Sequence, residues 1–118
     1  MAKMITKEVL ENLKKHPYLS KDGQGFDAVV EVYIFNPYGA GRWLITELDE
    51  VRDNGQIICF GYVNYNDQDA EFGSIDLTQL SELQVDVYGI SMPLERELHS
   101  KGKTIRQIEA IHGHTVWN

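Results

Sequence analysis

The chain has 118 residues and a formal net charge of −7, with 42% hydrophobic and 25% charged residues. This length allows one hydrophobic core, so we expect residues 1–118 to form a single domain. The composition excludes a disordered chain, and the apolar runs are too short for the ~20 residues of a membrane-spanning helix. The N-terminal sequence MAKMITKEVLENLKK lacks the apolar stretch of a signal peptide, which predicts a cytoplasmic protein without a membrane partner.

The N-terminal half predicts one helix followed by strands. Thr6 is a suitable N-cap for a helix that ends before Pro17. DAVVEVYIF (27–35) then alternates apolar residues as a strand does, and RWLITEL (42–48) continues with β-branched and aromatic residues. Asn54-Gly55 is typical of a hairpin turn.

Two further strands are predicted, IICFGYVNY (57–65) and EFGSIDL (71–77). Because parallel neighbours need long crossovers, four strands joined by short links favour an antiparallel meander. Cys59 is the only cysteine, so no internal disulfide or cysteine-rich zinc site is available, and we expect a small core residue there.

The C-terminal part predicts more helices. LTQLSEL (77–83) has helical spacing, VDVYGI (85–90) suits a fifth strand, and Pro93 is placed to start a helix through LERELH. Thr104 and Gln107 predict the capping box of a final helix. The expected fold is α+β, an antiparallel four- to five-stranded meander sheet packed with an N-terminal helix and C-terminal helices, which cover one sheet face.

Acidic residues concentrate in the middle of the chain. Residues 47–86 contain ten acids and one base, a net charge of −9, whereas both flanks are slightly positive. Such a field repels phosphate backbones, which disfavours direct nucleic-acid binding, and attracts a basic protein. The alternative is that turns simply collect Asp and Asn, and that the charge keeps the protein soluble. The candidate binding surface consists of Asp49, Glu50, Asp53, Asp67, Asp69 and Glu71.

No motif predicts a metal, a cofactor or a catalytic residue. NYNDQDAEFG (64–73) resembles a calcium loop, but Asp69 stands where such a loop needs Gly and Ile75 where it needs Glu, so we interpret it as a hairpin tip. Glu95 and His99 would share one helical face, where structural pairing is the favoured interpretation over chemistry. The chain has neither a G-x-S-x-G nor a G-x-G-x-x-G motif.

Several short motifs occur together in this sequence. They are Trp43 and Glu47 in the second strand, Phe60-Gly61 in the third, EFG (71–73) before LSEL (80–83), and PLERELH (93–99). The combination resembles, over nearly the whole chain, a bacterial and phage family called domain of unknown function two-nine-five-eight. That resemblance implies small soluble proteins of plasmids, conjugative elements and phages, without an established activity. By analogy, such proteins are often accessory or anti-defence factors.

Three functional hypotheses follow. The leading one is a non-catalytic protein of a mobile element whose acidic surface binds a basic protein, such as a host defence nuclease. The alternative is a small-molecule-binding protein or minor hydrolase, with a pocket formed by Trp43, Glu47, Glu71, Arg96 and His99. The third is a homodimer that forms through an aromatic patch on the second sheet face, made by Tyr33, Phe35, Trp43 and Tyr62. The alternative is that these residues are simply packed inside the protein.

Overall fold

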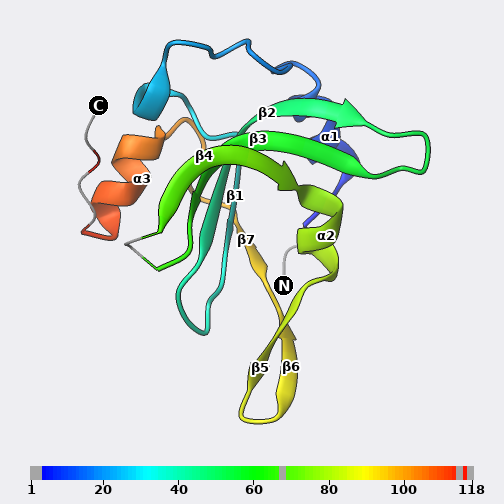
Figure 1. Cartoon of the computed structure of the whole chain (residues 1–118), viewed down its shortest axis with the longest axis vertical. Coiled ribbons are helices and arrows are strands. Elements are labelled where there is room, and N and C mark those ends of the chain that lie inside the picture. The colour runs from blue at the N-terminus through cyan, green and yellow to red at the C-terminus, as the bar shows by residue number, and fades with distance from the viewer. Residues whose placement is uncertain (1–3, 67–68, 114–115, 117–118) are drawn as a thin grey trace.

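The computed structural model describes residues 4–66, 69–113 and 116 of the chain. Its helices and strands confirm the α+β class (Figure 1). The elements in chain order are α1 (Lys7–Leu13), the 3-10 helix η1 (Gly25–Asp27), β1 (Val32–Phe35), β2 (Arg42–Val51), β3 (Ile57–Asn64), β4 (Ala70–Asp76), α2 (Leu77–Glu82), β5 (Gln84–Val87), β6 (Ile90–Pro93), β7 (Glu95–Glu97) and α3 (Ile105–Ile111).

The main sheet has five strands in the order β4-β3-β2-β1-β7. Each strand is antiparallel to its neighbours, so the predicted meander of β1 to β4 is confirmed. The hairpin between β2 and β3 turns at Asn54-Gly55, where Gly55 has a φ of +88°, a conformation that glycine adopts without strain.

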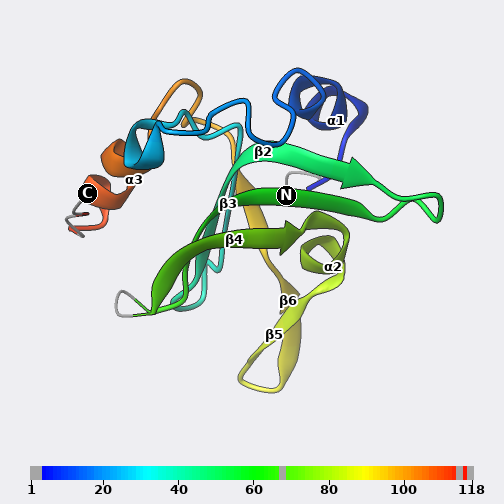
Figure 2. The ribbon, with the colours of Figure 1, turned by 45° about the horizontal axis from the view of Figure 1, so that its top comes forward.

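Two expectations about the segment after α2 are wrong. VDVYGI does not join the main sheet, because Tyr88 and Gly89, with φ of 52° and 84°, close a tight turn that pairs β5 with β6. This hairpin projects from the rest of the molecule (Figures 1 and 2). LERELH is not helical either, because Glu95–Glu97 form β7 and pair with the free edge of β1. Glu95 and His99 therefore share no helical face.

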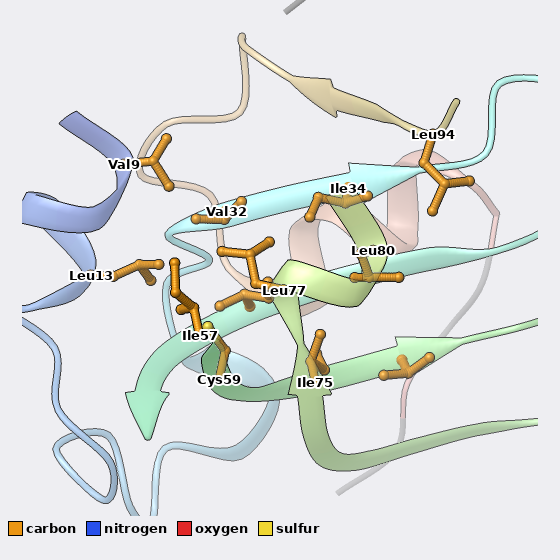
Figure 3. Close-up of a cluster of buried hydrophobic side chains, with 12 residues drawn as sticks. Val9, Leu13, Val32, Ile34, Ile57, Cys59, Ile75, Leu77, Leu80 and Leu94 are labelled. Atoms are coloured by element: carbon orange, nitrogen blue, oxygen red, sulfur yellow. The ribbon is translucent and has the colours of Figure 1, made fainter. Parts of the chain in front are cut away.

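Both faces of the main sheet are covered, whereas helices on one face were expected. Because side chains alternate along a strand, Val32 and Ile34 of β1 point to one face and Tyr33 to the other. The first face packs against α1, α2 and Leu94 in the cluster that Figure 3 shows. The second face packs against η1 and α3.

The predicted helix starts are confirmed at α1 and α3. The Thr6 hydroxyl accepts a hydrogen bond of 3.0 Å from the Val9 amide. At α3, the Thr104 hydroxyl accepts from the Gln107 amide at 3.2 Å, and the Gln107 side chain accepts from the Thr104 amide at 2.9 Å. Each cap satisfies amides that a helix leaves unpaired in its first turn.

The chain passes from the first face to the second between α1 and η1. His16 and Pro17 lie beside Leu48 of β2, whose amide donates a 2.8 Å hydrogen bond to the His16 carbonyl. Beyond that point Tyr18 contacts Phe60, which faces the second side of the sheet. The following residues, 18–28, therefore form a loop over the second face (Figures 1 and 2). None of the helices that the structure describes is long and apolar enough to span a membrane.

Candidate functional site

The predicted acidic surface is divided between two places in the fold. Asp49, Glu50 and Asp53 lie at the end of β2 and in the β2–β3 turn, whereas Asp69 and Glu71 lie at the β3–β4 turn. These turns are at opposite ends of β3, an eight-residue strand, and so about 25 Å apart (Figure 1). Antiparallel pairing imposes this separation, so the described carboxylates do not share one surface. Asp67 lies outside the described residues.

The acidic end at the β2–β3 turn is partly neutralised by its own base. The Arg52 guanidinium donates to the Glu50 carboxylate at 2.9 Å, and that hydrogen bond raises the pKa of Arg52. Asp76 at the start of α2 accepts from the Gln79 amide and thereby caps this helix. The exposed ion pair of Arg52 and Glu50 contributes little to stability.

The residues of the predicted pocket are divided within the fold: Trp43, Glu71 and Arg96 share the first face of the sheet, whereas Glu47 and His99 lie elsewhere. Trp43 packs into the first-face core and contacts Tyr65 edge-on, and exposed Glu71 pairs with Val63 on that same face. Arg96 pairs with Ile34, also on the first face, and exposed His99 borders a different hollow beside α3. Glu47 lies on the second face.

A β-bulge explains why Trp43 and Glu47 face opposite sides. Residues four apart in a regular strand share a face, but the register between β2 and β3 shifts between Ile45 and Glu47. Ile45 therefore packs with the first-face core, whereas Glu47 lies opposite Phe60 on the second face. Bulges commonly re-aim a side chain in this way, and they are frequent beside functional sites.

Gly61 makes this close packing of β2 and β3 possible. It pairs with Ile45 next to the bulge, and a Cβ atom at this position would lie 2.1 Å from the Leu44 carbonyl oxygen. No larger residue fits there without moving the backbone. The Thr46 hydroxyl, at the bulge, donates to the Phe60 carbonyl at 3.3 Å.

A cavity of about 570 Å³ lies over Glu47, between the loop of residues 18–28 and the second face of the sheet. This volume is within the range of small-ligand sites. The residues that line it come from the loop and from β2, β3 and β4: Tyr18, Leu19, Lys21, Asp22, Gly23, Gln24, Gly25, Phe26, Ala28, Thr46, Glu47, Phe60 and Phe72.

The carboxylate of Glu47 is buried in this cavity wall without a partner. Its residue is 4% exposed, and its Oε2 atom has no hydrogen-bond partner among the described residues. In that part of the chain, it is the one buried side-chain nitrogen or oxygen in this condition. Taking an unpaired carboxylate out of water costs several kcal/mol, so proteins rarely retain one without a use for it.

The lysine that lines the same cavity is already paired. The Lys21 ammonium donates to the Val29 carbonyl and to Glu31 Oε2, each at 2.6 Å. Burial by itself would raise the pKa of Glu31, but hydrogen bonds from Lys21 and Asn12 and the nearby positive charges lower it. Lys21 is thus engaged by Val29 and Glu31, and it does not pair with Glu47 Oε2.

Aromatic rings form the apolar part of the cavity wall. The rings of Tyr18 and Phe60 meet edge-on at 5.5 Å, those of Phe60 and Phe72 lie nearly parallel at 6.3 Å, and Phe26 contacts Phe72 at 5.2 Å. Tyr18 and Phe72 remain 45% and 38% exposed, so part of this surface is open to a ligand. We call these four residues the aromatic wall.

The loop over the cavity contains a strained backbone position. Leu19 has a φ of 73°, in the left-handed region that a leucine rarely adopts, and it is 58% exposed. Strain of this kind costs of order 1–3 kcal/mol and is concentrated at functional sites.

The second face also holds a buried ion pair that sequence reasoning missed. Arg42 Nε donates to both carboxylate oxygens of Glu109, at 3.1 and 3.2 Å, and Asn64 Nδ2 donates to Oε2 at 3.4 Å. Glu109 follows Ile105 by one helical turn, so its position on the buried stripe was the available signal. These groups are mutually paired and join α3 to the sheet.

Two aromatic residues of the predicted dimer patch are packed within the second face and not free for a dimer contact, and Phe35 is half-buried. Tyr33 and Tyr62 are 8% and 4% exposed, beneath η1 and α3, and the Tyr33 hydroxyl lies 2.6 Å from His112 Nε2. Burial raises the pKa of Tyr33. Trp43, expected in the same patch, faces the opposite side.

Other chemistry is limited in the described part of the chain. Cys59 is fully buried, and burial raises the pKa of its thiol to about 12, so it is no nucleophile at neutral pH. No group of three or more His, Cys, Asp or Glu side chains among these residues is placed to hold a metal ion.

Comparisons with known proteins give a family but no activity. Residues 4–108 match the model of a family described as "Protein of unknown function (DUF2958)". Neither the curated proteins nor the solved structures gave a match. The family match confirms the resemblance expected from the sequence motifs.

Proposed function

The chain belongs to the DUF2958 family of proteins of unknown function, and we propose that it is a non-catalytic binding protein whose cavity over Glu47 receives a positively charged group. The observation that carries this proposal is the buried Glu47 carboxylate, whose Oε2 has no partner among the described residues. A cation that enters the cavity pairs with this charge and offsets the desolvation that Glu47 suffers in the free protein.

The charge of the whole chain favours the same kind of ligand. The net charge of −7 and the acidic ends of the β2–β3 and β3–β4 hairpins attract cations over a Debye length of about 8 Å at physiological salt. This attraction raises the local concentration of a cation, whereas the Glu47 cavity provides the contact that selects it. The separate acidic ends thus assist binding without forming one interface.

The partner expected from the sequence fits this proposal as the carrier of the cation. We propose that a basic protein presents a positively charged side chain to the cavity, and that a host defence nuclease is such a protein. The role in a phage, plasmid or other mobile element comes from the family resemblance. Affinity purification of the tagged chain from cells that carry its native element, with Glu47→Gln as the comparison, identifies the partner.

The binding itself is testable with small cations. The purified full chain is titrated calorimetrically, at constant ionic strength, with alkylammonium and guanidinium salts. Because a charge-assisted hydrogen bond contributes about 1.5–3 kcal/mol, Glu47→Gln should lower the affinity for the most tightly bound cation by roughly 10- to 150-fold.

The matched control is Glu71→Gln, which removes an exposed carboxylate on the other face of the sheet. It should leave the affinity unchanged within about twofold, since it alters only the long-range field. Failure of every cation to bind, or equal loss of affinity in both variants, contradicts the proposal.

A further inference from the structure

We infer that the group bound over Glu47 is an alkylammonium, a nitrogen that carries aliphatic carbons and at least one N–H, and that the aromatic wall selects it. This inference rests on the proposed function, because it names the chemical class of the cation that the cavity receives. It adds a second recognition element, made by Tyr18, Phe26, Phe60 and Phe72, to the carboxylate.

The aromatic wall favours a cation with hydrocarbon around its charge. Ring faces attract cations through their negative potential, and alkylated ammonium groups are ligands that proteins recognise in this way. Tyr18, Phe60 and Phe72 line the same cavity as Glu47, with Tyr18–Phe60 and Phe60–Phe72 ring centroids 5.5 and 6.3 Å apart. A strongly hydrated inorganic ion gains nothing from this apolar lining.

The carboxylate favours a single N–H donor over a guanidinium fork. Glu47 Oε2 is shielded from solvent, so a ligand in the cavity reaches the carboxylate only at its other oxygen, Oε1. A guanidinium makes its strongest contact when both carboxylate oxygens are open to its two parallel N–H groups. An ammonium is a compact charge that needs only one acceptor, so it is the better fit to this geometry.

A metal ion is the remaining alternative, and the donor set does not suit one. Hard cations need several oxygen ligands. In the part of the chain that the structure describes, Glu47 has no companion carboxylates or histidines arranged as a metal-binding group. The cavity, at about 570 Å³, instead has room for an amine together with its alkyl chain.

The experiment compares cations of similar size on the full-length protein at pH 7 and constant ionic strength. The probes are dimethylethylammonium, which has one N–H, ethyltrimethylammonium, which has none, and ethylguanidinium. Calorimetric titration should give the tightest binding for dimethylethylammonium, with both other probes weaker by about fivefold or more. Titrations with spermidine, a free amine, and with a peptide that contains a dimethylated lysine then distinguish a metabolite from a protein side chain as the source of the alkylammonium group.

Two variants test the aromatic wall. Phe72→Leu keeps an apolar side chain but removes a ring that is 38% exposed, so the fold should tolerate it. This substitution should lower the affinity for dimethylethylammonium by about two- to fivefold. Tyr65→Leu removes an exposed ring that contacts Trp43, away from the cavity, and should have no effect.

The outcomes separate this inference from the proposed function. Equal or tighter binding of ethylguanidinium, still lost in Glu47→Gln, overturns the alkylammonium class and leaves the cation site standing. Unchanged affinity in Phe72→Leu overturns the role of the ring. Binding of dimethylethylammonium that survives in Glu47→Gln, or no binding of any probe, overturns the proposed function as well.

Discussion

Replacing Glu47 by methionine should stabilise the free protein. The variant removes a buried charge whose Oε2 has no partner among the described residues, and it keeps a side chain of similar length beside Phe60. A buried polar group without a hydrogen bond costs about 1–3 kcal/mol, and an unpaired charge costs more. We therefore expect the free energy of unfolding to rise by about 1–3 kcal/mol.

For a chain of this length, that gain corresponds to a rise in Tm of roughly 4 °C for each kcal/mol. Urea denaturation gives the free energy directly, provided that Glu47→Met and the parent protein have the same m value. Glu71→Gln, an exposed change on the opposite sheet face, should stay within about 0.5 kcal/mol of the parent.

A Glu47→Met variant that is less stable than the parent by more than about 1 kcal/mol would contradict this expectation, because a loss of that size indicates a favourable interaction of the carboxylate. A stabilised variant that no longer binds cations would show that Glu47 lowers the stability of the free protein and is needed for binding. Such an exchange of stability for function is common at binding sites.

Three further predictions concern the framework around the site. Gly61→Ala should destabilise the protein by several kcal/mol in urea denaturation, because its Cβ would overlap the Leu44 carbonyl oxygen; a loss below about 0.5 kcal/mol would contradict this packing. Glu109→Ala should cost about 3–5 kcal/mol, since it removes the buried carboxylate that accepts from the Arg42 guanidinium, whereas Glu109→Ala combined with Arg42→Met should recover part of that loss. Glu31→Gln should cost more stability at pH 7 than at pH 3. Because the pKa of Glu31 is lowered in the folded protein, its stabilising contribution is present above its ordinary pKa of 4.5 and disappears as the pH falls through the folded-state value. A loss of stability that does not change with pH would be evidence against the pairing of Glu31 with Lys21.

Local signals in the sequence predicted much of the fold. The caps at Thr6 and Thr104 and the Asn54-Gly55 turn depend on a few neighbouring residues, and the structure confirms each of them. The prediction of a helix at LERELH was wrong because the structure of this segment depends on a tertiary contact. Its acids and apolar residues suit a helix, but the open edge of β1 pairs with Glu95–Glu97, and this tertiary contact outweighs the local preference.

The site was harder to predict because two of its determinants are not local. The separation of the acidic residues follows from the antiparallel direction of β3, which places Asp53 and Asp69 at opposite ends of one strand. Glu47 points to the second face because of a bulge, and no residue type marks a bulge unambiguously. Gly61, opposite the bulge, was the available clue, since glycine within a strand often accompanies close backbone approach.

A chemical-shift map of the ¹⁵N-labelled full chain, recorded during titration with dimethylethylammonium at constant ionic strength, locates the bound cation. Binding in the Glu47 cavity predicts the largest amide shifts at Glu47, Phe60, Phe72 and residues 18–26, and their loss in Glu47→Gln. Shifts that are instead largest at residues 52–56 and at Glu71, or that are equal around the molecule, would show that the acidic hairpin ends attract the cation and that the cavity does not select it.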